Sequence, residues 1–483
     1  MAIAAAARIT DTELFRQRHL ADARRALPEH FERIAWPGAR IRAERQTRLQ
    51  ALIAVAKARS PWHRRRLAHI DPETVTEDDL GRIPPMTKDD LMAHFDEIVT
   101  DPRLALGLVE SHLAAIDGEA YLFDRYHAVA SSGSSGRRGV FVHDWDAWTT
   151  YYLACFRFLL RERLRTDDRD RRPTRMAAVA AGRPTHMSAA TFRTFSDPAR
   201  LELHRFPVTL PLEEIVAGLD EVQPDILSGY PSALHQLALE AKAGALTVAP
   251  QQIVVYAEPL LTEHRHTLEE VWGAPVHNWW GTSEANVIAA ACGRGPGLHL
   301  HDDLYLVEPI ALGGAPVRVG ERSAAVLLTN LRNHALPLIR YEITDEITLL
   351  DGGCPCGSAL RRIADVEGRL EEAFHYPEVP LVHPHVFRTR LAAEPAIVDY
   401  QVAQTCDGVE VRAQCAGQPD LERVRSSLVE GLGRCGLSSP QVSVVPVPAL
   451  DRGSTGKLMR FVALDPLAGR SASTRDAASA VRQ

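Results

Sequence analysis

The sequence predicts a large α/β lobe followed by a small α+β lobe. Three observations lead to this prediction. At 483 residues the chain is longer than one hydrophobic core normally serves. From about residue 175, short apolar runs alternate with longer helical patterns, which is typical of mostly parallel sheets covered by helices. After residue 369, strand-like runs such as VDYQVAQ and QVSVVPV surround one helical pattern at 420 to 433, as in an α+β unit.

The N-terminal part is predicted to be helical. Residues 41 to 59 repeat apolar positions with a helical period and keep charges on the opposite side. The apolar face consists of Leu49, Leu52, Ile53 and Ala56. A further helix is expected to begin at Thr87, an N-cap residue that follows the helix-stopping pair Pro84 and Pro85.

The strands of the large lobe are predicted at 176 to 181, 225 to 230 and 252 to 258, where apolar runs are short and bounded by turn residues. A helical stretch at 233 to 244 separates the last two. Residues 325 to 350 combine β-rich runs with turn residues, and they indicate a strand-rich subdomain beside the sheet.

Composition excludes several classes of protein. Hydrophobic residues make up 45% and charged residues 24%, as in an ordinary globular enzyme, and the net charge of −7 offers no general attraction to nucleic acid or anionic membranes. No apolar run approaches about 18 residues, the length that a membrane helix needs. The opening MAIAAAAR lacks the basic region of a secretory signal, and seven scattered cysteines suit a reducing compartment. We therefore expect a cytoplasmic protein without nucleic-acid or membrane partners.

The stretch SSGSSGRRG begins at Ser131 and has two interpretations. Small polar residues and glycines make flexible linkers, but they also form loops whose backbone N–H groups and hydroxyls bind phosphate. Arg138 and its neighbour add positive charge that a spacer does not need. The candidate phosphate-binding residues are Ser131, Ser132, Gly133, Ser134, Ser135, Gly136 and Arg137.

Further motifs follow this loop in a fixed order. They are Tyr256-Ala257-Glu258-Pro259-Leu260, Trp279-Trp280-Gly281-Thr282-Ser283-Glu284, Arg340-Tyr341-Glu342-Ile343-Thr344-Asp345, Gly368-Arg369 and Ser454-Thr455-Gly456-Lys457-Leu458-Met459-Arg460. In this order they resemble the core motifs of the adenylate-forming superfamily, which includes acyl-CoA synthetases, adenylation domains of peptide synthetases and luciferases. Together they favour the phosphate loop over the linker.

Within that superfamily the chain is most similar to the phenylacetate-CoA ligase branch. The likeness rests on Ser60-Pro61-Trp62-His63, on Ile83-Pro84-Pro85-Met86-Thr87-Lys88-Asp89-Asp90-Leu91, and on Cys354-Pro355-Cys356-Gly357. It covers about residues 40 to 465. It implies an ATP- and acid-binding domain at 1–368 and a small mobile domain at 369–468. The polar residues 469–483 are expected to form a disordered tail.

The resemblance assigns a role to each motif of the large lobe. The loop would hold the β- and γ-phosphates of ATP, Glu284 would help to hold Mg²⁺, and Asp345 would accept hydrogen bonds from the ribose hydroxyls. Without the motif, Glu284 could be a helix N-terminal residue and Asp345 a turn residue. The expected adenine-side set is Tyr256, Ala257, Glu258, Pro259, Trp280, Gly281 and Thr282. Trp280 would stack near adenine or wall the acyl pocket.

Two cationic residues and a set of pocket residues complete the expected site. Lys457 would come from the mobile domain to bridge the acid and the α-phosphate, whereas a lone loop lysine is normally only solvated. Arg369 would contact ribose or support the hinge, or else form a surface salt bridge. The acid would be lined by Tyr230, Trp279 and His186; a core role for Trp279 and a structural role for His186 stay open.

Four further residues could bind a metal. Cys354 and Cys356 lie on one turn, and Cys292 and His299 form a second pair, so together they offer a four-ligand zinc set. Such a closed shell would be structural. Small thiols buried under a glycine-rich turn are the equally open alternative.

The predicted function is ATP-dependent adenylation of a small aromatic or hydrophobic carboxylic acid, with release of pyrophosphate and transfer of the acyl group to CoA. One alternative keeps the adenylation and transfers the acyl group to an amine or a carrier-protein thiol. Another is a nucleotide-binding relative without turnover. The identity of the acid and the oligomeric state are left open, with a homodimer among the alternatives.

Overall fold

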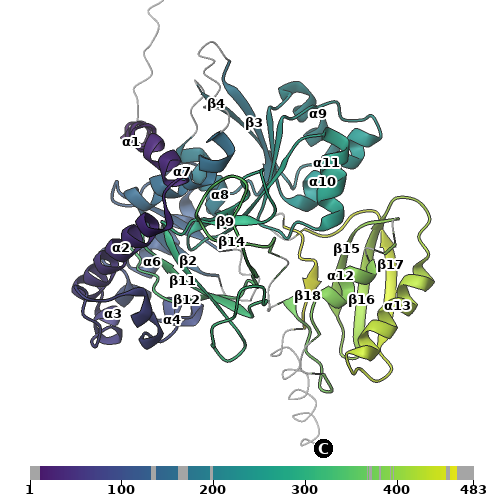
Figure 1. The fold of residues 1–483 in the computed structure, drawn as a ribbon. Coiled ribbons are helices and arrows are strands. Elements are labelled where there is room, and N and C mark those ends of the chain that lie inside the picture. The colour runs from purple at the N-terminus through teal and green to yellow at the C-terminus, as the bar shows by residue number, and fades with distance from the viewer. Residues whose placement is uncertain are drawn as a thin grey trace, which may run out of the picture. The chain divides into compact units, whose positions relative to one another are not determined.

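A computed structural model gives the fold, which Figure 1 shows as a ribbon. It describes residues 11–131, 138–161, 172–195, 200–366, 368, 372–379, 382–391, 393–394, 396–452 and 457–464. The chain divides into two compact units, Met1–Glu367 and Gly368–Gln483. The sequence had predicted a boundary after residue 368. The predicted tail at 469–483 lies outside the described residues.

The first unit begins with helices and short helical turns. They are α1 (Asp11–Arg33), α2 (Gly38–Arg59), α3 (Pro61–Arg66), η1 (Glu77–Arg82), α4 (Lys88–Ala93), α5 (Phe95–Ile98) and α6 (Leu106–Ala115). The predicted apolar face of α2 is fully buried and packs with Ile83 and Ile339. Thr87 caps α4, since its side chain accepts a hydrogen bond from the Asp90 amide and the Asp90 carboxylate accepts one from the Thr87 amide. Both predictions are confirmed.

A nine-stranded sheet forms the centre of this unit, in the order β13-β14-β9-β8-β7-β6-β5-β3-β4. Its strands are β3 (Thr174–Ala180), β4 (Leu201–Pro207), β5 (Ile226–Gly229), β6 (Gln252–Tyr256), β7 (Val276–Thr282), β8 (Asn286–Ala290), β9 (Leu298–Leu300), β13 (Leu349–Leu350) and β14 (Arg362–Ile363). The strands from β4 to β7 are parallel, and those from β7 to β13 pair antiparallel. The prediction of mostly parallel sheets is therefore wrong for half of the pairings between these strands, because an apolar run does not encode strand direction.

Helices cover the parallel half of the sheet. They are α7 (Trp145–Arg161), α8 (Met187–Thr194), α9 (Leu212–Val222), α10 (Pro231–Lys242) and α11 (Thr262–Trp272). In Figure 1, α9, α10 and α11 lie together on one side of β3, and α7 and α8 lie on the other side. Each parallel strand from β5 to β7 is thus connected to the next by a helix, as parallel pairing requires.

Two smaller sheets complete the first unit. β1 (Tyr126–Ala130) and β2 (Val140–Asp144) form an antiparallel hairpin. β10 (Tyr305–Ile310), β11 (Ala325–Asn330) and β12 (Tyr341–Ile343) form an antiparallel three-stranded sheet. The predicted strand-rich segment at 325 to 350 contains β11 and β12, but it is not a separate subdomain throughout, because β13 joins the large sheet.

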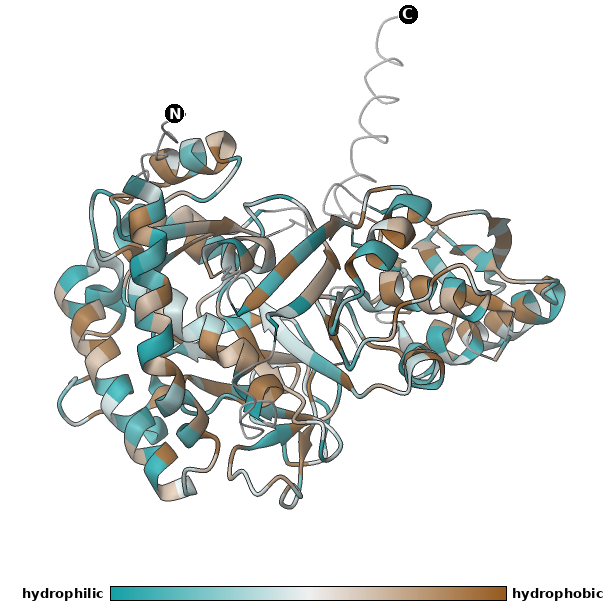
Figure 2. Ribbon diagram, turned by 90° about the horizontal axis from the view of Figure 1, so that it is seen from above, coloured by the Kyte–Doolittle hydropathy of each residue, from teal (hydrophilic) through white to brown (hydrophobic). Residues whose placement is uncertain are grey.

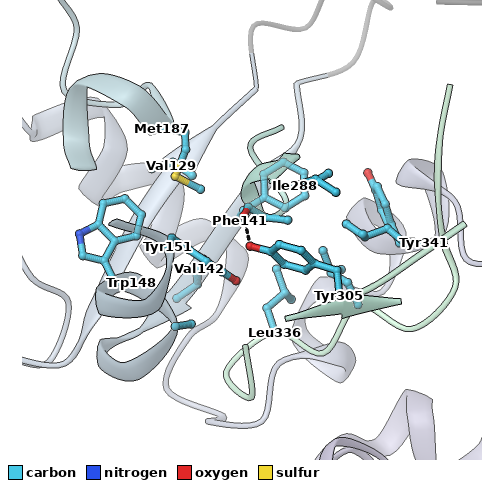
Figure 3. Packing of buried hydrophobic residues seen from close by; sticks show 14 of the residues in the cluster. Val129, Phe141, Val142, Trp148, Tyr151, Met187, Ile288, Tyr305, Leu336 and Tyr341 are labelled. Atoms are coloured by element: carbon cyan, nitrogen blue, oxygen red, sulfur yellow. Dashed lines mark hydrogen bonds between the residues drawn. The ribbon is translucent and has the colours of Figure 1, made fainter. Parts of the chain in front are cut away.

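A hydrophobic core connects the hairpin, α7 and the antiparallel strands. Figure 3 shows Phe141, Tyr151, Tyr305 and Tyr341 converging from these elements, with Trp148 at one side. Each of these side chains is at most 1% exposed. The Tyr305 hydroxyl donates a hydrogen bond to the carbonyl of Ala285, so the core also fixes the turn between β7 and β8.

The second unit has the predicted α+β composition. β15 (Ile397–Gln404), β16 (Gly408–Cys415), β17 (Gln441–Val447) and β18 (Phe461–Val462) form a sheet in the order β17-β16-β15-β18, accompanied by α12 (His385–Leu391) and α13 (Leu421–Arg434). Among the described helices of both units, none is long and apolar enough to cross a membrane. Figure 2 shows why, since hydrophilic residues interrupt the hydrophobic ones along the helices.

Candidate active site

The predicted site residues of the large lobe follow the carboxyl ends of neighbouring parallel strands. β3, β5, β6 and β7 are adjacent and run in the same direction, so these ends share one edge of the sheet. In chain order this edge is followed by His186 before α8, Tyr230 after β5, Tyr256 to Glu258 at the end of β6, and Trp280 to Glu284 at the end of β7. Ligands of open α/β sheets bind at this edge.

Trp280 and Asp345 meet although 65 positions separate them in the chain. The indole N–H of Trp280, on β7, donates a 2.9 Å hydrogen bond to Oδ2 of Asp345, which follows β12. Both side chains are buried, with 6% and 5% of their surface exposed. A hydrogen bond to a buried carboxylate is among the stronger ones. The bond fixes the direction of both side chains, which the sequence had treated separately.

Glu284 lies in the turn between the antiparallel strands β7 and β8. Its backbone carbonyl accepts a 3.0 Å hydrogen bond from Nδ2 of Asn330. A Cβ atom at Gly281 would lie 2.3 Å from the carbonyl oxygen of Asn286, so only glycine fits where the hairpin closes. The alternative that Glu284 begins a helix is wrong, because β8 follows the turn directly.

Thr282 brings a second oxygen to the same turn. Its Oγ1 atom is buried and has no hydrogen-bond partner among the described residues. An unpaired buried hydroxyl costs free energy, and a ligand that accepts or donates a hydrogen bond there removes that cost. Thr282 belongs to the nucleotide-binding set expected from the sequence.

The end of β6 has a strained backbone. Ala257 has φ = +70°, a conformation that residues with a Cβ atom rarely adopt and that is often found at functional sites. On either side, Tyr256 packs edge-on against Tyr230 with ring centroids 6.3 Å apart, and Glu258 accepts a 3.3 Å hydrogen bond from the amide of Ser232 at the start of α10. Burial raises the pKa of the Tyr256 phenol, which therefore stays neutral.

A cavity of about 290 Å³ opens between β3, β4 and α8. Its lining consists of Ala178, Ala180, Ala181, Gly182, Ser188, Ala189, Phe192, Leu203, Arg205, Phe206, Pro207 and Tyr256. The side chains of β3 and α8 that line the cavity are mostly small. Tyr256, at the carboxyl end of β6, also lines it, so the cavity adjoins the sheet edge where the predicted site residues lie. Sequence analysis missed Phe192 and Arg205. Only the cluster of alanines in MAAVAAG and SAA hinted at a hollow there.

None of the three residues predicted to line the acid pocket is among the residues that line this cavity. Tyr230 accepts a 3.2 Å hydrogen bond from the amide of Ala181, which forms part of the wall. Trp279 is 4% exposed and packs edge-on against Phe156 in the hydrophobic core. His186 is half-buried at the start of α8. The surroundings of Trp279 match the core role that the sequence had left open.

The base of the glycine-rich loop is a closed hairpin. The Ser131 amide donates to the carbonyl of Gly139, and the Gly139 amide donates to Oγ of Ser131 at 2.8 Å. A linker between domains is excluded, because the strands that the loop connects pair with each other. The predicted residues Ser132 to Arg137 lie outside the described part of the chain.

The remaining predicted residues belong to three other places. Lys457 lies half-buried in the second unit, next to Leu458, which forms a β-bridge with Arg452. Arg369 lies outside the described residues, as do positions 454 to 456. Cys292, His299, Cys354 and Cys356 are brought together in the first unit, at the antiparallel half of the large sheet.

Comparisons with known proteins agree with this picture. No protein-family model matches the chain. The phenylacetate-coenzyme A ligase of Thermus thermophilus is 26% identical over 394 residues, which are 77% of this chain and 80% of that protein. The chain is therefore similar in sequence to a phenylacetate-CoA ligase. The relationship predicted from the motifs is thereby confirmed.

Solved structures agree at the level of the fold. A 2-hydroxyisobutyryl-CoA ligase in the postadenylation state superimposes with a TM-score of 0.70 at 19% identity, covering 92% of this chain and 93% of that protein. An open conformation of the same enzyme, in complex with 2-HIB-AMP and CoA, gives a TM-score of 0.58 at 20% identity, covering 90% and 93%. The chain therefore shares the mixed α/β fold of these solved CoA ligases.

Proposed function

We propose that this chain is an AMP-forming acid–CoA ligase. In the first step a carboxylate oxygen of the acid attacks the α-phosphorus of ATP, which forms acyl-AMP and releases pyrophosphate. In the second step the CoA thiol attacks the acyl carbon, loses its proton and displaces AMP. The observation that carries the proposal is the Trp280–Asp345 hydrogen bond, which unites two of the predicted nucleotide motifs at one buried point. The relative that is 26% identical over 394 residues is itself a phenylacetate-coenzyme A ligase.

The nucleotide is expected to bind along the edge where β5, β6 and β7 end. Asp345, oriented by Trp280, would accept hydrogen bonds from the ribose hydroxyls. The left-handed backbone at Ala257 would let the chain lie against adenine, bordered by Tyr256 and Glu258. The loop from Ser132 to Arg137 would hold the β- and γ-phosphates with amide and guanidinium donors.

Magnesium fits the donors of the turn between β7 and β8. Glu284 offers a carboxylate, and two positions earlier in the chain Thr282 offers a hydroxyl without a hydrogen-bond partner among the described residues. Both are oxygen ligands, which Mg²⁺ prefers. When bound, the ion would neutralise charge that develops on the phosphates. Asn330 and Tyr305 donate hydrogen bonds to the backbone carbonyls of Glu284 and Ala285 and so fix the backbone of this turn.

The acid is proposed to enter the cavity between β3, β4 and α8. A volume of about 290 Å³ is at the lower end for small-molecule sites and suits a small carboxylic acid. Phe192 and the alanines provide an apolar lining. Arg205 adds a positive charge near the wall, where it could attract the carboxylate as it arrives.

The chain contains only four lysines, and Lys457 is the one in the expected mobile loop. Its ammonium group would bridge the carboxylate and the α-phosphate during adenylation. The test is ATP–pyrophosphate exchange with benzoate, phenylacetate, 2-hydroxyisobutyrate and acetate, followed by mass spectrometry of acyl-CoA after CoA is added. Lys457→Ala should lose exchange with the responsive acid.

Lys242→Ala is the matched control, because Lys242 is an exposed residue of α10 that forms a surface ion pair with Glu270. It should keep full exchange. Full exchange in Lys457→Ala would remove the proposed role of this lysine. If the wild-type protein supports exchange but forms no thioester, the acceptor is not CoA. The name of the T. thermophilus relative favours CoA over an amine or a carrier-protein thiol.

Zn²⁺ also belongs among the proposed cofactors. Its role would be structural and separate from the reaction.

A further inference from the structure

Four metal-binding side chains meet at the antiparallel half of the nine-stranded sheet. Cys292 follows β8, His299 lies on β9, and Cys354 and Cys356 belong to the segment between β13 and β14. One ligand atom from each residue lies within 4.8 Å of the other three. The two halves of the cluster are far apart in sequence, with 62 positions between Cys292 and Cys354. The fold therefore assembles the cluster from two separate loops.

Two distances between ligand atoms are close to those around tetrahedral zinc. The Sγ atoms of Cys292 and Cys354 are 3.6 Å apart, and Sγ of Cys356 is 3.4 Å from Nε2 of His299. With Zn–S of about 2.3 Å and Zn–N of about 2.05 Å, a regular tetrahedron has S···S and S···N edges of about 3.8 and 3.6 Å. A disulfide needs its sulfur atoms about 2.05 Å apart. The observed sulfur pair is too distant for a disulfide and close to a zinc edge.

The backbone around the cluster is fixed by hydrogen bonds. His299 pairs with Ala290 of β8 and with Arg362 of β14, so the sheet register places its ring. The two cysteines of the second segment sit on a tight turn, in which the Gly357 amide donates to the Cys354 carbonyl and Gly357 adopts φ = +79°. Backbone hydrogen bonds therefore fix both halves of the site.

The surroundings also suit a negatively charged metal site. The Arg294 amide points at Sγ of Cys292 at 3.5 Å, a contact that stabilises a thiolate. Arg362 is 8% exposed and donates to the carbonyls of Pro296 and Asp351, at 3.1 Å each, which are on the two loops that carry the ligands. Its positive charge is thus held beside the cluster.

We propose that Cys292, His299, Cys354 and Cys356 bind one structural Zn²⁺ ion. Binding would release three thiol protons to solvent, and three thiolates with a neutral imidazole would leave the centre with one net negative charge. Four protein ligands leave no coordination position for water or substrate. The simpler interpretation, small thiols packed under a glycine-rich turn, does not explain why three thiols and an imidazole place their ligand atoms within 4.8 Å of one another.

The ion would hold together the two loops at the far end of β8. β8 starts directly after the turn that contains Glu284 and ends two residues before Cys292. The zinc would therefore anchor the strand that supports the proposed nucleotide site without contacting substrate. The proposal rests on the ligand geometry alone and does not depend on the proposed ligase activity.

The experiment measures metals in the full-length protein, expressed without a histidine tag in zinc-containing medium. Mass spectrometry of the metals should find one zinc per chain in the wild type, and Cys354→Ser should lose it. Cys406→Ser is the matched control, because Cys406 is an exposed cysteine of the second unit and should leave zinc content unchanged. Excess chelator should lower the melting temperature of the wild type, and Zn²⁺ but not Mg²⁺ should restore it.

Three results would overturn the proposal. The first is that wild-type protein contains no zinc and that its melting temperature does not change when chelator is added. The second is a Cys292–Cys354 disulfide in protein analysed without reductant. The third is iron in place of zinc. Each is measured on wild-type protein, so the test remains valid even if Cys354→Ser folds poorly.

Discussion

Replacing Trp280 by phenylalanine removes the N–H group that holds Asp345 and keeps an aromatic ring on β7. The lost bond is 2.9 Å long and joins two side chains that are at most 6% exposed. A hydrogen bond to a charged group contributes about 1.5–3 kcal/mol. If Asp345 binds the ribose, a loss of that size weakens ATP binding by about 10- to 150-fold, since 1.4 kcal/mol corresponds to a factor of ten. We expect the KM for ATP in the exchange assay to rise by at least about tenfold.

Trp148→Phe is the matched control. The Trp148 indole also donates a 2.9 Å hydrogen bond, to Oγ1 of Thr194, and the residue is fully buried in the core that Figure 3 shows. The acceptor is a neutral hydroxyl that does not belong to the expected nucleotide-binding set, so this substitution should lower the melting temperature while the KM for ATP stays unchanged. An unchanged KM for ATP in Trp280→Phe would refute the argument that Trp280 positions Asp345.

Further predictions concern pH, backbone geometry and substrate size. Burial raises the pKa of Glu119 to about 7, so the folded state favours the protonated carboxyl. The free energy of unfolding should therefore fall as pH rises from about 4.5 through 7, by up to about 1.4 kcal/mol per pH unit. Urea unfolding at several pH values should show that Glu119→Gln removes this loss. Gly281→Ala should destabilise the protein by about 1–3 kcal/mol, because its Cβ would collide with the Asn286 carbonyl, whereas Gly107→Ala, which has open space, should not destabilise it. Phe192→Ala enlarges the cavity and should raise the KM of the preferred small acid by about tenfold or more, measured by exchange, with larger acids least affected.

Local structure followed from local sequence where the responsible contacts are local. The buried face of α2 and the Thr87 cap of α4 depend on residues three or four positions apart, and such spacing is visible in the chain itself. The antiparallel half of the large sheet was missed for the opposite reason. Most residues of β8 are apolar, as in a parallel strand, and the directions of β8, β9 and β14 depend on pairing with distant partners.

The same distinction applies to the candidate site. Residue order alone identified the motifs and the relationship to phenylacetate-CoA ligase, because chemically required residues stand in a recognisable sequence. It also supplied the four zinc candidates, but it could not separate a ligand set from buried thiols. Their ligand atoms come within 4.8 Å only because two loops are joined by the pairing of β8, β9 and β14.

The sequence by itself thus determined which reactive groups the chain contains: the glycine-rich loop with its arginines, the carboxylates, the lysine and the thiols. Tertiary structure decided which of these groups meet. It joined Trp280 to Asp345, placed Trp279 in the core, and left a cavity beside Tyr256 that was not predicted from the sequence. The physical reason is that directions of side chains and empty space arise from packing between segments far apart in the chain, whereas the residue pattern records only what lies near in sequence.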